Sequence, residues 1–207
     1  MDPTLVAQSL LNGLLFGGVY SLMAVGLTLI FGVMRVVNFA HGDMMVWGMY
    51  LAWLLATRLG IDPYIGFVPC AAALWLFLFR TELGRLMRAT ADNTFGALVI
   101  GTDVRRVYAV AFGVGAACVG AAGALVSSIL PFQPPTGLSL SVTSFNIVII
   151  GGMGSLLGAF IGGLLVSVAE SLGAVFLKPS LKELVSFSLL IVILLFRPAG
   201  LFGKRTS

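Results

Sequence analysis

The chain has 207 residues, of which 59% are hydrophobic and 10% are charged, and its mean hydropathy is +1.08. Soluble domains carry about 25% charged residues, so this composition excludes a soluble globular protein and indicates an integral membrane protein. The net charge of +4 comes from 12 basic and 8 acidic residues. Nucleic-acid binding is excluded as well, because no soluble domain is available to present the basic side chains.

Long stretches without Asp, Glu, Lys or Arg alternate with short charged segments along the chain. A membrane-spanning helix needs about 20 apolar residues, and these stretches are apolar on every face, unlike the alternating strands of outer-membrane barrels. The pattern predicts an all-α polytopic membrane protein with about seven transmembrane helices, including short or broken segments. The expected crossings are residues 5–33, 44–57, 63–79, 107–130, 143–152, 156–177 and 184–196.

Basic residues predict the orientation of these helices. Most of them lie in a loop at residues 80–107 and in the tail at residues 197–207, and the positive-inside rule places both segments in the cytoplasm. Residues 35–43 then lie on the same cytoplasmic side and the N-terminus lies outside. The breaker-rich PFQPPTG, residues 131–137, is expected to form an external turn or a re-entrant segment. Residues 1–207 are expected to form a single transmembrane domain.

The segment NFAHGD, residues 38–43, gathers polar side chains between two apolar helices. These side chains belong to Asn38, His41 and Asp43. An Asn or Asp can cap the start of a helix, which is a sufficient structural explanation. Ionisable groups at membrane depth are costly unless they are satisfied or useful, so lining or gating a translocation path is the functional explanation. Both explanations remain open from the residues alone.

The loop at residues 80–107 is rich in arginine, yet it also contains apolar residues such as Leu86, Met87 and Phe95. A loop that only orients the protein does not need apolar side chains. Short helices with an apolar ridge beside charges are typical of segments that dock into a groove on a partner. The alternative is an interfacial helix that lies on the headgroups of the membrane lipid.

The 26 glycines of the chain are not randomly spaced. Gly154, Gly158 and Gly162 recur every four residues, which predicts one helix face that packs closely against another helix. GGMGS, residues 151–155, places four small residues within five at the end of a short apolar segment. This composition predicts an unwound stretch inside the membrane, and such breaks often line a translocation path.

The sequence shows no catalytic machinery. It has one histidine, and it contains neither a phosphate-binding loop nor a CxxC pair, so no cofactor and no metal are expected and any ATP-driven work requires another chain. The enzyme alternative depends on His41 and Asp43 acting together. Glu170 is interpreted either as an acid near the membrane interface or as one that bonds a neighbouring helix.

Four segments of the chain resemble the branched-chain amino-acid ABC transporter permeases of the LivH type, in the family's order. They are NGLLFGGVYSLMAVGLTLIFGVMRVVNFAHGDMMVWGMY (residues 12–50), TELGRLMRATADNTFGALVIGTDVRRV (81–107), FNIVIIGGMGSLLGAFIGG (145–163) and FRPAGLFG (196–203). The resemblance implies a multi-pass permease subunit of an ATP-driven importer in a bacterial or archaeal inner membrane, with a path for branched-chain or related amino acids. It also implies a second homologous permease subunit, two ATP-binding subunits and a periplasmic or lipid-anchored solute-binding protein.

The resemblance also assigns candidate residues by position. Residues 85–101 look like the family's cytoplasmic coupling segment, and the coupling candidates are Arg85, Arg88, Ala89, Asp92, Phe95, Ala97 and Gly101. NFAHGD and GGMGS look like the family's signature segments beside the translocation path. The path candidates are Asn38, His41, Asp43, Gly151, Gly152, Gly154 and Ser155.

The chain departs from the family between its second helix and the coupling loop. LivH-type chains have additional helices and another basic loop there, whereas residues 65–79 join the two ends directly. The chain is therefore expected to be internally shortened by about two crossings, and an even number leaves the orientation of later helices unchanged. Two alternative functions remain: a stand-alone channel or ion-coupled carrier that uses Asp43 and Glu170, and a shortened paralogue that inserts but does not transport.

Overall fold

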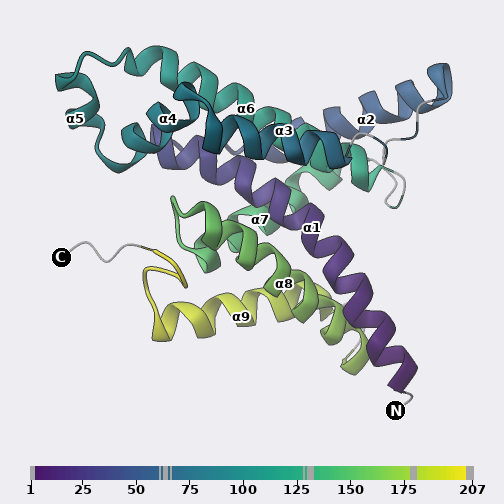
Figure 1. Cartoon of the computed structure of the whole chain (residues 1–207). Helices are drawn as coiled ribbons and strands as arrows, with labels where there is room; N and C mark the ends of the chain where they lie inside the picture. Colours follow the sequence, from purple (N-terminus) through teal and green to yellow (C-terminus); the bar gives the residue numbers. More distant parts are fainter. Residues whose placement is uncertain are drawn as a thin grey trace. The chain divides into compact units, whose positions relative to one another are not determined.

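The computed structural model describes residues 3–60, 62, 65, 67–127, 129, 133–177 and 181–203. In this part of the chain all regular structure is helical (Figure 1). The helices are α1 (Pro3–Met34), α2 (His41–Leu59), α3 (Phe67–Arg80), α4 (Glu82–Asp92), α5 (Thr94–Val99), α6 (Val104–Val126), α7 (Pro134–Gly151), α8 (Leu156–Phe176) and α9 (Lys182–Phe196).

Three helices are long and apolar enough to cross a membrane, namely those over Thr4–Met34, Val104–Val126 and Leu156–Phe176. A shorter apolar helix covers Pro135–Gly151. Seven helices of the described residues overlap the seven segments expected to cross, and the two remaining helices, α4 and α5, are short and lie in the Arg-rich loop. The predicted all-α polytopic membrane fold is therefore confirmed.

Two compact units make up the chain. Unit 1 consists of Met1–Thr28 and Val142–Ser207, and unit 2 consists of Leu29–Ser141. Unit 1 therefore contains most of α1, the second half of α7, and helices α8 and α9. Unit 2 contains α2 to α6 and the start of α7. The expectation of a single domain over residues 1–207 stays a prediction.

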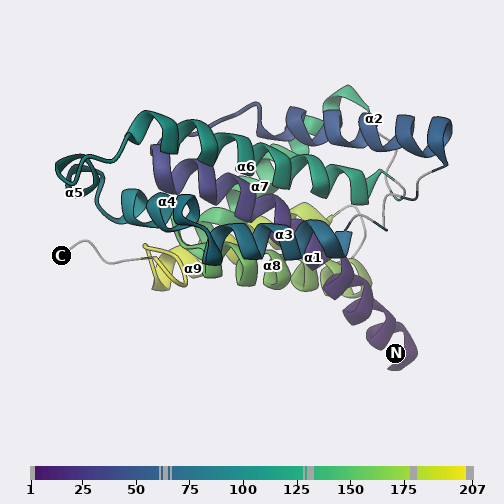
Figure 2. The same ribbon diagram turned by 45° about the horizontal axis from the view of Figure 1, so that its top comes forward.

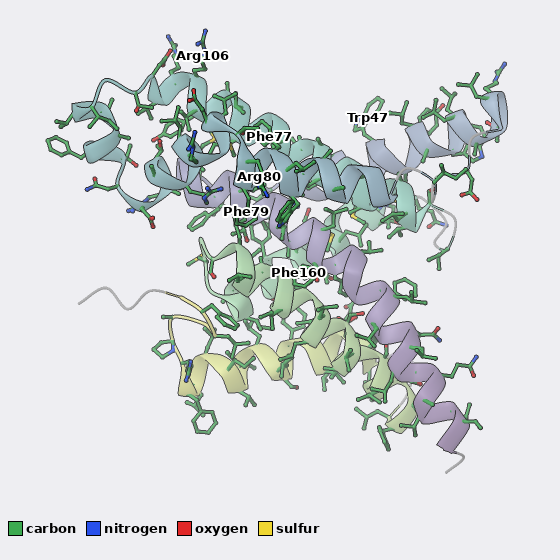
Figure 3. All side chains as sticks on the ribbon, viewed as in Figure 1. Trp47, Phe77, Phe79, Arg80, Arg106 and Phe160 are labelled. Carbon is green, nitrogen blue, oxygen red and sulfur yellow. The ribbon has the colours of Figure 1, made fainter. Side chains whose placement is uncertain are left out.

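In unit 2, helices α2 and α6 cross with their backbones in contact. A Cβ on Gly48 would collide with the backbone of Gly120, and a Cβ on Gly123 would collide with the carbonyl oxygen of Met45. Small residues permit such close crossings in lipid, where packing and not the hydrophobic effect holds helices together. Figure 3 shows Trp47 on the side of α2 that is turned away from α6, and its side chain is 73% exposed.

Helix α3 contacts α6. It leads directly into α4 (Figure 2). Thr81 caps α4, because its Oγ1 accepts a hydrogen bond from the backbone N–H of Gly84 at 3.1 Å. The guanidinium of Arg88 turns back onto α3, where it donates to the carbonyl oxygen of Leu78 and lies 5.1 Å from the ring centre of Phe79. These contacts fix the start of the Arg-rich loop to the helix before it.

In unit 1, helix α8 packs against α1 on one side and against the second half of α7 on the other. A Cβ on Gly13 would lie 2.9 Å from the Cα of Val168, so α1 and α8 touch at their backbones. Further along α1, the Oγ of Ser21 donates a hydrogen bond of 2.6 Å to the carbonyl oxygen of Phe160. This bond satisfies a buried hydroxyl that would otherwise be costly in an apolar environment.

Helix α7 is longer than the sequence indicated. The sequence predicts a short element at residues 143–152 preceded by an external turn or a re-entrant segment at residues 131–137, but α7 already begins at Pro134. Proline is tolerated in the first turn of a helix because its missing N–H has no intrahelical partner there. Residues 131 and 132 lie outside the described residues.

Candidate functional site

The first candidate region is the polar turn, residues 38–43, which precedes α2. Asn38 Oδ1 accepts a hydrogen bond from Ala40 N at 3.1 Å, and Ala40, the residue at the N-cap position, makes no side-chain cap bond. The structural explanation, in which Asn38 or Asp43 caps α2, is therefore wrong. The capping group comes from α7 instead: Ser141 Oγ accepts from Gly42 N at 2.8 Å.

Ser141 ties the polar turn in two places. Besides accepting from Gly42 N, its hydroxyl donates to the carbonyl oxygen of Phe39 at 3.2 Å. The first N–H groups of a helix have no partner within it, so a single serine from a distant helix satisfies one of them and holds the preceding turn. The two ionisable residues of the turn differ in burial, since His41 is fully buried and Asp43 is exposed.

The polar turn lies towards the end of α6 that is opposite α4 and α5. Gly123, which contacts the first turn of α2, lies about 28 Å along α6 from Val104 at 1.5 Å per residue. Gly137, from the segment expected outside, packs against Asp43. These contacts favour the side of unit 2 opposite the Arg-rich loop for the polar turn, and the expectation that residues 35–43 lie on the same side as that loop stays a prediction.

The second candidate region is the glycine turn, residues 151–155, in unit 1. Helix α7 ends at Gly151 and α8 begins at Leu156, so the predicted break in helical structure is present. Gly152 has φ 100° and Gly154 has φ 86°, which are conformations that L side chains rarely adopt. Ser155 caps α8, since its Oγ accepts from Gly158 N at 3.1 Å.

Two of the three glycines assigned to helix packing lie on α8. A Cβ on Gly158 would collide with the carbonyl oxygen of Gly151, and a Cβ on Gly162 would lie 3.0 Å from the carbonyl oxygen of Ile147. Gly154 lies in the turn before α8 and not on the helix, so its assignment to the same helix face is wrong. The four-residue spacing of these glycines continues across the start of α8 at Leu156, and the spacing does not show where the helix begins.

The third candidate region is the coupling segment, residues 85–101, which forms α4 and α5 in unit 2. Arg85 is exposed and forms an ion pair of 3.7 Å with Glu82. Ala89 and Asp92 are exposed on α4, Gly101 is exposed after α5 with φ 80°, and Figure 3 shows Arg106 pointing away from the start of α6. Arg88, by contrast, is engaged with α3, so its main contact lies within the unit.

Helix α5 has one buried residue and several exposed apolar ones. Ala97 is only 5% exposed, so it packs inside unit 2. An exposed apolar patch surrounds it, formed by Phe95 (75% exposed), Leu98, Val99 and Ile100. The α5 patch, as we call these four residues, is therefore the exposed apolar part of α5 and of the residue that follows it.

Sequence reasoning missed a polar cluster in unit 1. Glu170 on α8 is 3% exposed and forms an ion pair of 3.2 Å with Lys182 on α9. Tyr20 on α1 donates from its hydroxyl to the same carboxylate at 3.2 Å, and the ammonium of Lys182 lies 5.9 Å from the ring centre of Phe16. The interpretation of Glu170 as an acid that bonds a neighbouring helix is confirmed, but nothing in the spacing identified its two partners.

The path candidates divide between the units. Asn38, His41 and Asp43 belong to unit 2, whereas Gly151, Gly152, Gly154 and Ser155 belong to unit 1. Among the described residues no group of three or more His, Cys, Asp or Glu side chains is arranged to hold a metal ion. The assignment of these residues to a path, and of residues 85–101 to coupling, stays a prediction.

Comparison with a protein-family model gives a match over most of the chain. Residues 9–69 and 64–194 match the model described as "Branched-chain amino acid transport system / permease component". The match consists of two pieces that overlap at residues 64–69, around the start of α3. No solved structure matches the chain.

Curated proteins that the chain is similar to include permease proteins of branched-chain amino acid transport systems. The chain is 25% identical to the high-affinity branched-chain amino acid transport system permease protein LivH of Salmonella typhimurium and 26% identical to BraD of Pseudomonas aeruginosa, each over 293 aligned positions that cover 95% of both chains. It is also 30% identical to the permease protein LivM of Escherichia coli, over 126 residues that cover 60% of this chain and 29% of LivM.

The alignment lengths measure the internal omission. Since 95% of 207 residues is about 197, about 96 of the 293 positions aligned with LivH have no residue from this chain. The meeting of the two family matches at residues 64–69 places the main break after α2. Both observations agree with the expected shortening between the second helix and the Arg-rich loop.

Proposed function

Because the chain belongs to the family of branched-chain amino acid transport system permease components, we propose that it is one permease subunit of an ATP-driven importer. In this role it forms part of the translocation path for branched-chain or related amino acids in a bacterial or archaeal inner membrane. The observation that carries the proposal is the family match over residues 9–194 in a chain whose helices are apolar enough to span a membrane.

The subunit works with other chains. The sequence has no phosphate-binding loop, so two separate ATP-binding subunits supply the energy. A second homologous permease completes the path, and the similarity to both LivH and LivM supports a pair of related permeases. A periplasmic or lipid-anchored solute-binding protein delivers the amino acid.

The α5 patch supports the coupling part of the proposal. Phe95 and Ile100 are each 75% exposed in a loop that also carries exposed arginines. Large apolar side chains that stay exposed beside charges are typical of protein interaction sites. We therefore assign the α5 patch to contact with an ATP-binding subunit. The polar turn and the glycine turn are the segments that we assign to the path.

A second candidate function is a shortened paralogue that assembles without transporting. It is favoured by the about 96 positions that LivH has and this chain lacks. An ion-coupled carrier is less well supported, because one of its two acidic candidates, Glu170, is already paired with Lys182. Asp43 is then the remaining acidic candidate for ion coupling.

Reconstitution separates these functions. The chain is placed in proteoliposomes with its second permease, the two ATP-binding subunits and the binding protein from the same organism, and uptake of radiolabelled leucine is measured with and without ATP. ATP-dependent uptake that requires this chain supports the importer. Assembly and ATP hydrolysis without uptake identify the shortened paralogue, and uptake that is independent of ATP identifies a channel or carrier.

A further inference from the structure

The segment that follows α9 returns to the end of α7 and bonds to it. Leu201 N donates to the carbonyl oxygen of Ile150 at 2.9 Å, and Phe202 N donates to that of Gly151 at 3.0 Å. The last carbonyl groups of a helix have no partner within it, and both Ile150 and Gly151 are buried. The returning segment therefore supplies donors that these two carbonyls would otherwise lack.

Glycines allow this close approach on both sides. A Cβ on Gly200, which has φ 79°, would lie 2.6 Å from the Cα of Gly152. A Cβ on Gly152, which has φ 100°, would collide with the backbone of Gly203. A side chain at either position would clash and would also strain the backbone, so the two segments fit each other only as glycines.

From these contacts we propose that residues 197–203, here called the C-terminal strap, are a positioning element that holds the glycine turn in its conformation. The inference rests on the proposed function, since it matters for transport only if the glycine turn lines the path. The strap acts through backbone N–H groups, and its close approach to the glycine turn requires glycine at position 200.

A tail that only oriented the protein would not need this structure. The positive-inside rule requires only that a cytoplasmic tail carries basic residues, and it does not require the tail to pack against another helix. Here the guanidinium of Arg197 instead bonds back within the strap, donating to the carbonyl oxygen of Leu201 at 3.3 Å. Gly200 N also donates to the carbonyl oxygen of Arg197 at 2.9 Å, which closes a tight turn after α9.

Two matched pairs of variants test the strap in the full-length chain. Leu201→Pro removes the donor to Ile150, whereas Leu201→Ala keeps it. Gly200→Ala adds a Cβ against Gly152, whereas Gly60→Ala adds one at φ 65° with no atom within 4 Å. The second pair separates the strain of a positive φ, which both alanines suffer, from the clash that only Gly200→Ala produces.

The first readout is the accessibility of the end of α7. A cysteine at position 150 is introduced into a chain whose Cys70 and Cys118 are replaced by alanine, and its labelling is followed in nanodiscs. Labelling should be about fivefold faster with Leu201→Pro than with Leu201→Ala, as expected for local opening after loss of one hydrogen bond. The cysteine at position 150 should also be labelled faster with Gly200→Ala than with Gly60→Ala. Equal labelling rates within both pairs would overturn the proposal.

The unmodified protein provides a readout that needs no variant. Hydrogen exchange of the peptide that covers the strap should be slower than that of a free peptide, because Leu201 N and Phe202 N are bonded. Exchange at the free-peptide rate would show that the strap is not bound and would overturn the proposal.

A transport readout distinguishes positioning from mere support. In the reconstituted importer, Leu201→Pro should lower the leucine carried per ATP hydrolysed while co-purification of the ATP-binding subunits stays unchanged. Unchanged transport per ATP despite faster labelling would reject the positioning role. If the unmodified chain carries no leucine at all while labelling still responds, the strap's hold on the glycine turn stands and the proposed function fails.

Discussion

Glu170 and Lys182 form an ion pair between α8 and α9, with 3.2 Å between Glu170 Oε2 and Lys182 Nζ. The carboxylate is almost completely buried, whereas the lysine side chain is 45% exposed, and the hydroxyl of Tyr20 donates to the same carboxylate oxygen at 3.2 Å. The cluster joins α1, α8 and α9, so three segments separated by up to 162 positions are held at one point. The cluster therefore links three helices of unit 1 to one another.

Removing one partner of this pair should destabilise the protein more than removing both. Lys182→Met leaves a buried carboxylate without its counter-charge, and we expect a loss of about 1–3 kcal/mol, reduced from the fully buried case because solvent reaches the lysine. The double variant Glu170→Gln with Lys182→Met should recover part of this loss. Thermal unfolding in detergent measures both changes, with Glu183→Gln, an exposed acid on α9, as the control. Additive effects of the two single changes would show that the pair is not coupled.

The crossing of α2 and α6 should respond asymmetrically to alanine. Gly48→Ala places a Cβ against the backbone of Gly120 and should cost about 1–3 kcal/mol through overpacking. A Cβ on Gly120 itself has no atom within 4 Å, so Gly120→Ala should be neutral or stabilise the helix by about 0.5–1 kcal/mol. Thermal stability of the two variants in the same detergent checks this order. Equal losses at both positions would mean that the helices do not cross at this point.

Docking of an ATP-binding subunit should depend on Phe95 and not on the buried residue beside it. Phe95→Asp places a charge in the α5 patch and should weaken co-purification of the ATP-binding subunit by about 30-fold in affinity, as for an interface hot spot of about 2 kcal/mol. Phe95→Leu, which keeps an apolar side chain, is the matched control. Ala97→Glu is a poor test, because Ala97 is buried and a charge there would disturb unit 2 itself.

The outcome for Phe95→Asp also separates two contacts of the α5 patch. If the variant retains the ATP-binding subunit and full stimulation of ATP hydrolysis, the patch does not dock that subunit. The patch would then be assigned to contact with lipid headgroups, as an interfacial helix.

Labelling of single cysteines should show that the polar turn and the coupling segment face opposite sides of the membrane. We expect an impermeant reagent added to intact cells to label Asp43→Cys and to miss Thr94→Cys. Asp43 is exposed and packs against Gly137 near the far end of α6, whereas Thr94 begins α5 in the Arg-rich loop. Permeabilised cells provide the control for reactivity at position 94. Labelling of Thr94→Cys in intact cells would reverse the orientation of unit 2.

The sequence by itself determined the class of the protein and the break between α7 and α8. A bilayer requires long apolar segments whose backbone bonds are satisfied internally, so helices can be located from composition alone, and α6 and α8 appear close to their expected positions. The glycine turn was also predictable from its cluster of small residues. Gly152 and Gly154 adopt positive φ values that other residues avoid, so glycine is needed at these positions. These features are local, and each depends on residues within a few positions of one another.

The tertiary structure alone decided which isolated polar groups meet. Gly42 bonds to Ser141, Glu170 to Lys182 and Tyr20, and the end of α7 to the C-terminal strap. A predominantly apolar helix can turn any face towards a neighbour, because its apolar side chains are about equally stable against lipid and against protein. The faces that meet are set by close backbone approaches at glycines and by the need to satisfy each buried polar group, and both depend on all packed helices of a unit together.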